Sequence, residues 1–149
     1  MFYLLQLPIE LKFKNVKAIK ISEFARWLNE EALPKPLIID ARSGEEYAVS
    51  HIKSAQHIDP DNLNLVQLGE VALDTPIVVY CSIGFRSAIV SQKLSSSGYK
   101  NVFNLNGGIF QWANQGYPIF QNQHQVEIVH PYNFIWGKLL KSKYRAHIN

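Results

Sequence analysis

The sequence predicts an α/β domain with three layers, in which helices cover both faces of a mostly parallel sheet. Short apolar segments without polar alternation, at residues 37–39 and 77–80, are typical of strands buried on both faces. Segments in which apolar residues have helical spacing lie between them, so strands and helices alternate along the chain. The length of 149 residues fits one such domain with one core.

Residues 1–18 are predicted to form an N-terminal extension or an edge strand. Apolar and polar side chains alternate imperfectly up to Ile19, and the lysines among them would discourage pairing with a further strand. The first clear helix is expected at residues 22–31, where the apolar side chains share one side of a helical wheel. Ser22 is its expected N-cap, and Pro34 lies beyond its end.

The following segments predict a strand, a capped helix and two weaker elements. Residues 37–39 form the strand, and after it Ser43 and Glu46 have the spacing of a capping box, which begins a helix. A short strand is expected around residues 55–58. Residues 63–73 fit a helix better than a strand.

The second half of the chain has clearer patterns. Residues 77–80 are β-branched and aromatic, which predicts a central strand. An amphipathic helix around residues 88–94 is closed by Gly98, a residue suited to the left-handed C-cap position. A strand at residues 102–105 and a helix that begins after a glycine pair and ends near Gly116 complete the alternation.

Residues 121–149 form a C-terminal extension for which the sequence predicts an amphipathic helix. Between residues 131 and 145, apolar residues recur at intervals of three and four, basic residues lie on another face, and Gly137 interrupts the pattern. Packing on its own domain is the favoured interpretation, ahead of a dimer contact, docking of a protein partner or attachment to an acidic membrane surface. The apolar residues are Tyr132, Ile135, Trp136, Leu139 and Leu140.

Composition and charge exclude several classes of protein. A net charge of +3 is too mild and too dispersed to indicate nucleic-acid binding. One cysteine, Cys81, excludes an internal disulfide scaffold and a thiolate zinc site. The apolar segments are much shorter than the roughly 20 residues of a membrane-spanning helix, and the N-terminus fits a secretory signal poorly. We therefore expect a cytoplasmic protein.

Cys81 stands at the C-terminal end of the central strand, the edge of a parallel sheet where ligands bind. The loop after it leads into a helix, so successive backbone N–H groups can converge on the sulfur and favour its thiolate. We therefore predict that Cys81 is a catalytic nucleophile rather than an inert buried side chain. The predicted substrate-binding residues of the loop are Ser82, Ile83, Gly84, Phe85, Arg86 and Ser87.

Three loop residues have individual expected roles. Gly84 allows a positive φ or close approach of the backbone to a ligand. Arg86 is always charged and can fix the loop or bind an anionic substrate. Ser87 can donate a hydrogen bond or cap the helix.

Polar residues outside the loop are also candidates. Asp40 and Arg42 follow the preceding strand at the same sheet edge, so they can contribute to the rim of the pocket. An ion pair or a capping role is the favoured interpretation, because charges at such a buried edge are usually paired. His51 and His57 lack a carboxylate at matching spacing, so we expect hydrogen-bonded histidines and no metal site.

Three motifs between residues 19 and 119 together resemble those of the single-domain rhodanese-like sulfurtransferases. The first consists of Asp40, Ala41, Arg42, Glu46, Tyr47, His51, Ile52 and Ala55. The second consists of Val79, Tyr80, Cys81, Gly84, Arg86 and Ser87. The third consists of Gly107, Gly108, Trp112, Gly116, Tyr117 and Pro118.

The resemblance implies a rhodanese-like domain at residues 19–120 with a parallel five-stranded sheet. It also implies that Cys81 accepts sulfane sulfur as a persulfide and passes it to a thiol, or to cyanide in an assay, without a cofactor. Members that use thiosulfate often carry basic residues where this chain has Ser82 and Ile83. The donor therefore stays open between thiosulfate and a less charged persulfide on a small thiol or a protein.

Two other functions remain as alternatives. A rhodanese-like module that binds or regulates proteins without turnover is one, but such a module has no physical need of Cys81 in an anion-binding loop. A cysteine-dependent phosphatase is the other. Only four residues separate Cys81 from Arg86, and this short loop favours a sulfur-sized ligand over a tetrahedral phosphate.

Overall fold

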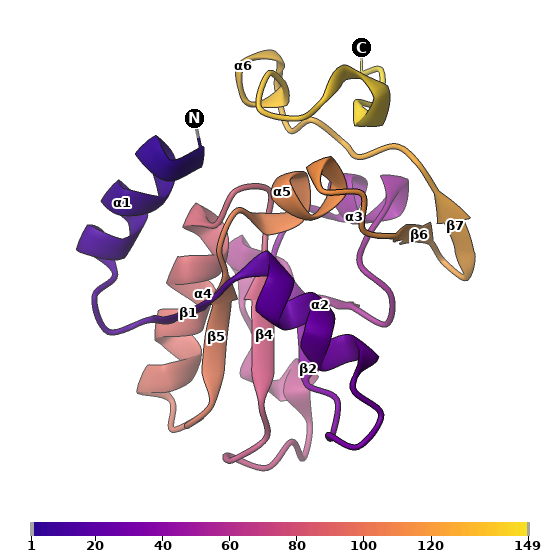
Figure 1. The fold of residues 1–149 in the computed structure, drawn as a ribbon. Helices are drawn as coiled ribbons and strands as arrows, with labels where there is room; N and C mark the ends of the chain where they lie inside the picture. The colour runs from indigo at the N-terminus through magenta and orange to yellow at the C-terminus, as the bar shows by residue number, and fades with distance from the viewer. Residues whose placement is uncertain (1, 149) are drawn as a thin grey trace.

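A five-stranded, all-parallel sheet forms the centre of the protein in the computed structural model, which describes residues 2–148 (Figure 1). The strand order is β1-β5-β4-β2-β3, so β4 lies in the middle. The predicted α/β class is therefore confirmed. The strands are β1 (Lys17–Ile19), β2 (Leu37–Asp40), β3 (Gln56–His57), β4 (Ile77–Tyr80) and β5 (Val102–Leu105).

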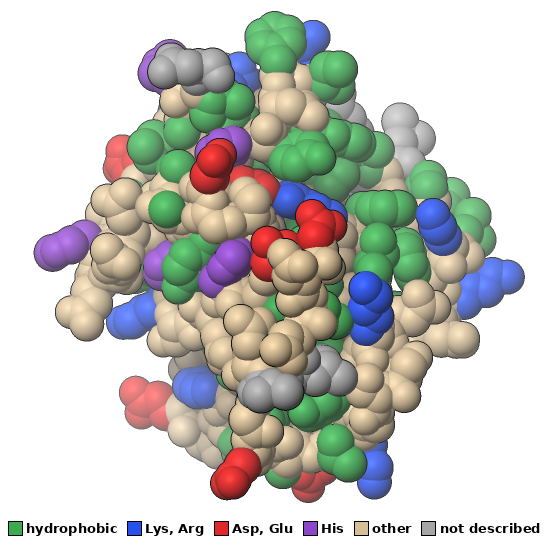
Figure 2. Space-filling model, turned by 180° about the vertical axis from the view of Figure 1, so that it is seen from behind, with side chains coloured by type: hydrophobic (Ala, Val, Ile, Leu, Met, Phe, Trp, Pro, Cys, Tyr) green, Lys and Arg blue, Asp and Glu red, His purple; other side chains and the backbone are tan. Residues whose placement is uncertain are grey.

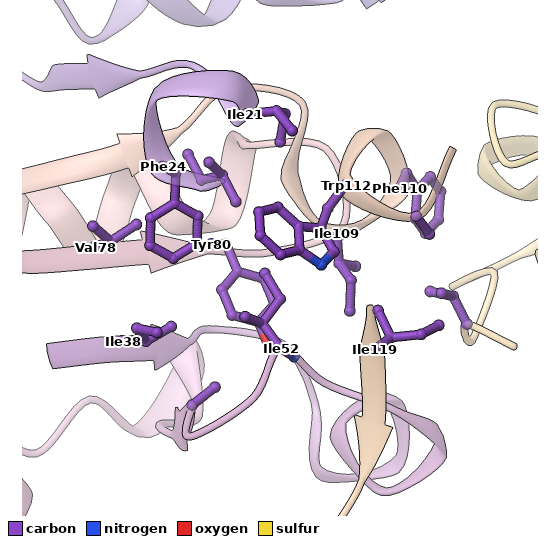
Figure 3. Close-up of a cluster of buried hydrophobic side chains, with 14 of the residues drawn as sticks. Ile21, Phe24, Ile38, Ile52, Val78, Tyr80, Ile109, Phe110, Trp112 and Ile119 are labelled. Atoms are coloured by element: carbon purple, nitrogen blue, oxygen red, sulfur yellow. Dashed lines mark hydrogen bonds between the residues drawn. The ribbon is translucent and has the colours of Figure 1, made fainter. Parts of the chain in front are cut away.

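Helices cover both faces of this sheet, as predicted for strands without polar alternation (Figure 1). Successive side chains of a strand point to opposite faces. Val78 therefore packs with α2 and α5 in the larger core, shown in Figure 3, whereas Val79 packs with α4 on the other face. The helices are α1 (Phe2–Lys12), α2 (Ile21–Asn29), α3 (Gly44–Val49), α4 (Phe85–Ser96), α5 (Gly108–Asn114) and α6 (Phe134–Gly137).

The N-terminal segment combines a helix that was not predicted with a short strand at the sheet edge. Residues 2–12 form helix α1, and only the short β1 occupies the sheet edge. Leu5, Ile9 and Phe13 recur every fourth residue and become buried or half-buried, and Ile9 and Phe13 pack against Ala88 of α4. A helix allows this burial because residues four apart share one face.

Two smaller predictions are also corrected. Helix α2 begins at Ile21 with Lys20 as its N-cap, so Ser22 lies inside the helix. Residues 63–73 contain only a short 3₁₀ helix, Leu65–Leu68. Within the described part of the chain, no helix is long and apolar enough to cross a membrane.

The C-terminal segment does not form the amphipathic helix, interrupted at Gly137, that was predicted between residues 131 and 145. It contains the hairpin β6 (Ile119–Gln121) and β7 (His124–Val126), the single turn of α6 and a 3₁₀ helix at Ser142–Tyr144. The segment folds back on itself, because Val129 N–H donates to the Tyr144 carbonyl at 2.7 Å.

Tertiary packing explains this difference. Val129 and Leu140 are both fully buried in the larger core, and the hydrogen bond between Val129 and Tyr144 brings the two ends of the segment together. A Cβ at Gly137 would lie 2.9 Å from Pro131 Cβ, so Gly137 permits a close chain crossing. The C-terminal segment therefore packs on its own domain.

Candidate active site

Cys81 follows β4 directly, and its loop leads into α4. The side chain is 1% exposed. The Gly84 N–H donates to Cys81 Sγ at 3.1 Å, and Gly84 has a φ of +121°, a region that favours glycine. The loop thus brings a backbone donor to the only sulfur nucleophile of the chain.

Asn104 of β5 hydrogen-bonds to the active-site loop through its side chain. Its side-chain amide donates to the Gly84 carbonyl at 3.0 Å. The Ser87 hydroxyl lies 2.5 Å from Asn104 Oδ1 and 3.3 Å from Cys81 Sγ. Asn104 was not among the predicted site residues, although a polar residue inside a buried apolar strand is a signal for such a role.

The N-terminus of α5 holds the other side of the loop. Ile109 N–H donates to the Cys81 carbonyl at 2.9 Å, and Phe110 N–H donates to the Ser82 carbonyl at 3.1 Å. A Cβ at Gly108 would lie 2.5 Å from both carbonyl oxygens. Glycine at this position therefore permits the contact between the α5 terminus and the loop.

Arg86 makes a bidentate ion pair with Glu46 of α3, with distances of 2.7 and 3.0 Å. Its guanidinium also donates to the Ser82 hydroxyl at 2.9 Å. The ring of Tyr132 lies 4.6 Å from the guanidinium carbon. Arg86 is therefore held by the loop and by α3, and its charge is largely offset where it meets the pocket.

The pKa values reflect this pair. Burial by itself raises the pKa of Glu46, but the hydrogen bonds and charge of Arg86 outweigh burial and lower it from 4.5 to about 2. Burial lowers the pKa of Arg86, whereas its bonds to Glu46 and nearby negative groups raise it more, so the net shift is upward. Both groups are consequently charged in the folded protein at neutral pH.

Asp40 and Arg42 form a second, fully buried ion pair, with a shortest distance of 2.7 Å. The Tyr80 hydroxyl also donates to Asp40, at 2.6 Å, and Arg42 donates to the Ser50 carbonyl, also at 2.6 Å. Neither Asp40 nor Arg42 lines the pocket that opens on Cys81. The pair instead ties the ends of β2 and β4 to the loop that follows α3.

His51 and His57 both make contacts with neighbouring residues of the domain. His51 stacks on Tyr47 with ring centroids 4.2 Å apart, and burial lowers its pKa. His57 Nε2 lies 2.6 Å from the Arg42 carbonyl. Among the described residues, no three side chains of histidine, cysteine, aspartate or glutamate are grouped to hold a metal ion.

A pocket of about 400 Å³ opens on Cys81. The loop supplies its floor, whereas two segments far apart in the sequence supply its walls. Figure 2 shows hydrophobic side chains gathered at this end of the molecule, where α1 and the C-terminal segment lie. The floor consists of Cys81, Ser82, Ile83, Phe85 and Arg86, and the walls consist of Leu5, Pro8, Ile9, Tyr132 and Trp136.

The fold and the loop define a known class. Residues 21–115 match the family model of the rhodanese-like domain. The chain belongs to this family, among its single-domain sulfurtransferases.

Relatives agree with this assignment. A sulfurtransferase of Allochromatium vinosum is 37% identical over 83 residues, which cover 56% of this chain and 77% of that protein. The thiosulfate sulfurtransferase GlpE of Haemophilus influenzae is 38% identical over 84 residues, which cover 56% of this chain and 78% of that protein.

Solved structures share the fold. A rhodanese-like domain protein from Staphylococcus aureus has a TM-score of 0.58 and 28% identity, covering 68% of this chain and 95% of that one. A Bacillus halodurans protein has a TM-score of 0.69 and 18% identity, covering 90% of this chain and 97% of that one. The family match excludes α1 and the C-terminal segment, which form the walls of the pocket.

Proposed function

We propose that this sulfurtransferase carries sulfane sulfur as a persulfide on Cys81. The observation that supports this most directly is the position of Cys81 Sγ at the floor of the pocket, with the Gly84 N–H 3.1 Å away. A preorganised N–H donor stabilises a thiolate and then the terminal anion of a persulfide. The α5 contacts to the loop carbonyls keep this geometry in place.

The reaction has two balanced steps. The Cys81 thiolate attacks the outer sulfur of the donor, the donor's S–S bond breaks, and the Cys81 persulfide forms while sulfite or an organic thiolate leaves. A thiolate or cyanide then attacks the outer sulfur, and the bond between the two sulfurs breaks to restore the Cys81 thiolate. Neither step needs an oxidant, a reductant or a cofactor.

The surrounding loop residues have supporting roles in the proposal. Ser82, Ile83 and Phe85 border the reacting sulfur, and Arg86 fixes the loop through Glu46. The relatives named thiosulfate sulfurtransferase support thiosulfate as a donor. The paired state of Arg86 and the lack of a basic residue at positions 82 and 83 support a persulfide donor as well.

Intact mass spectrometry tests the proposal. The reduced protein is incubated with thiosulfate and separately with glutathione persulfide, and each product is then treated with cyanide. We expect the gain of one sulfur atom, its loss on treatment, and no gain in a Cys81→Ser variant with wild-type circular dichroism. Absence of the adduct with both donors, while Cys81 is reduced and can be alkylated, would indicate a non-catalytic binding module.

A further inference from the structure

The walls of the pocket are built from parts of the chain outside the family match. We call the surface formed by Leu5, Pro8, Ile9, Tyr132 and Trp136 the vestibule. All five side chains are aliphatic or aromatic, and they stand between solvent and Cys81. A reaction partner of Cys81 therefore contacts the vestibule before it reaches the sulfur.

Helix α1 is anchored to the active-site loop. Gln6 donates from its side-chain amide to the Ile83 carbonyl at 2.9 Å. Phe13, just after α1, meets the ring of Phe85 edge-on with centroids 5.7 Å apart. Ile9 is buried beside Gly84. The α1 wall is consequently positioned by contacts with the catalytic loop itself.

The opposite wall is anchored in a different way. Tyr132 has a φ of +68°, which is rare for a residue with a side chain, and its N–H donates to His130 Nδ1 at 2.9 Å. Asn133 caps α6 by accepting from the Trp136 N–H at 2.8 Å. Backbone strain of this kind is concentrated at functional sites. Here it holds the Tyr132 ring over Arg86.

The vestibule disfavours a charged substituent on an organic thiol, because its walls offer that substituent no free cation. Arg86 is the one basic residue that lines the pocket among the described residues. Its charge is offset by Glu46, and the Tyr132 ring lies over it. A charged group that enters would lose water without gaining a free cation, which is unfavourable. An uncharged apolar group would gain free energy by leaving water.

We propose that the vestibule binds the uncharged apolar substituent of an organic thiol, and of the matching persulfide, and so selects the sulfur acceptor. This inference rests on the Cys81 persulfide proposed above. A volume of about 400 Å³ accommodates a ring or a branched chain next to the reacting sulfur.

The transfer is balanced in both directions. The acceptor thiolate attacks the outer sulfur of the Cys81 persulfide, the bond to Cys81 Sγ breaks, and an organic persulfide leaves. In reverse, the same organic persulfide loads Cys81 and the organic thiolate leaves. Because both directions share one complex, the vestibule selects the donor and the acceptor by the same contacts.

Two thiols that differ only by a carboxylate group test this selectivity. The persulfide form of the protein is mixed with benzyl mercaptan or with 4-(mercaptomethyl)benzoate, and the loss of sulfur is followed by quenched intact mass spectrometry. We expect benzyl mercaptan to react faster by on the order of tenfold, because the carboxylate must be desolvated against apolar walls. Equal rates, or a faster reaction of the carboxylate, would overturn the inference.

A pair of variants that place the same positive charge inside or outside the vestibule tests its role in this selectivity. Leu5→Arg is expected to reduce the preference for benzyl mercaptan about tenfold, because it supplies a free cation to the carboxylate. Leu11→Arg adds the same charge to α1 at a position that is 60% exposed and outside the pocket, so its preference should equal that of the wild type. A similar change in both variants would contradict a role for the vestibule.

Two further measurements separate the possible failures. If the circular dichroism spectrum of Leu5→Arg shows that it does not fold like the wild type, Trp136→Ala is used instead. Trp136→Ala is expected to lower the preference for benzyl mercaptan, because it removes apolar surface from the vestibule. Cyanide, which has no substituent, is applied to the wild type. If cyanide removes the sulfur from Cys81 but the two thiols react at equal rates, only the proposed role of the vestibule is overturned. If Cys81 does not accept sulfur at all, the proposed function is overturned.

Discussion

Gly108 shows how one residue outside the catalytic loop determines the geometry around Cys81. Its lack of a side chain lets the α5 N–H groups reach the carbonyls of Cys81 and Ser82. The sequence pattern predicts a turn at Gly107 and Gly108, but only the folded chain shows that Gly108 lies against the backbone carbonyls of Cys81 and Ser82. The same holds for Asn104, whose partners lie on other segments.

Gly108→Ala is expected to destabilise the protein by about 3 kcal/mol and to slow sulfur loading, because the new Cβ collides with two backbone oxygens at a φ of +58°. Gly116→Ala is the control. It has a φ of +84° but no atom within 4 Å of the added Cβ, so about 1 kcal/mol is expected from backbone strain alone. Urea unfolding of both variants measures the difference, and equal losses would contradict the close-approach explanation.

Glu46 makes the stability of the protein depend on pH. Its pKa is about 2 in the folded protein and near 4.5 when unfolded, so its contribution is complete above pH 4.5 and is lost as the pH falls toward 2. We expect Glu46→Gln to cost about 3 kcal/mol at neutral pH and about half of that at pH 3. Urea unfolding at both pH values measures this difference.

Glu45→Gln is the matched control for this prediction. Glu45 precedes Glu46 in the first turn of α3 but is exposed, so a change within about 0.5 kcal/mol is expected at either pH. A penalty for Glu46→Gln that does not vary with pH would show that its ion pair with Arg86 contributes little to stability.

Among the elements, the strands agreed best with the sequence and the terminal segments agreed least. β2, β4 and β5 are buried on both faces, so their apolar composition directly reports their environment. Helix α1 was not predicted, because the sequence does not reveal that Ala88 of α4 is its packing partner. Pro8 inside α1 also argues against a helix when the sequence is considered alone.

Helix α1 also shields the active-site loop, which can be tested through Cys81. Ile9→Ala removes buried contacts with α4, so α1 should detach more often and Cys81, now 1% exposed, should react several-fold faster with iodoacetamide. Leu11→Ala, on the exposed side of the same helix, should react at the wild-type rate. Unchanged alkylation in Ile9→Ala would show that α1 does not limit access to the sulfur.

In the whole molecule, the C-terminal segment belongs to the same core as the sheet. Val129 and Leu140 are buried with residues of β2, β4 and α5, and Asn114 of α5 donates to the Leu139 carbonyl at 2.8 Å. A segment outside the family match therefore contributes to the stability of the domain as well as to the pocket. The molecule should unfold as one cooperative unit.

Leu140→Ala is expected to destabilise the protein by about 2–5 kcal/mol, because it leaves a cavity in the larger core. Ile128→Ala, at a side chain that is 45% exposed in the same segment, should change stability by about 0.5 kcal/mol or less. Thermal unfolding followed by circular dichroism and by tryptophan fluorescence measures both. Separate transitions by the two probes would show that the C-terminal segment unfolds independently.

The sequence by itself determined the alternating α/β order, the strand that ends at Cys81, the capping box of Ser43 and Glu46, and the loop that holds the nucleophile. These features depend on neighbours in the chain, so local patterns report them. Tertiary structure alone decided that Glu46 pairs with Arg86 and that α1 and the C-terminal segment meet above Cys81. Those contacts join residues far apart in sequence, and burial and charge pairing select them only after the chain has folded.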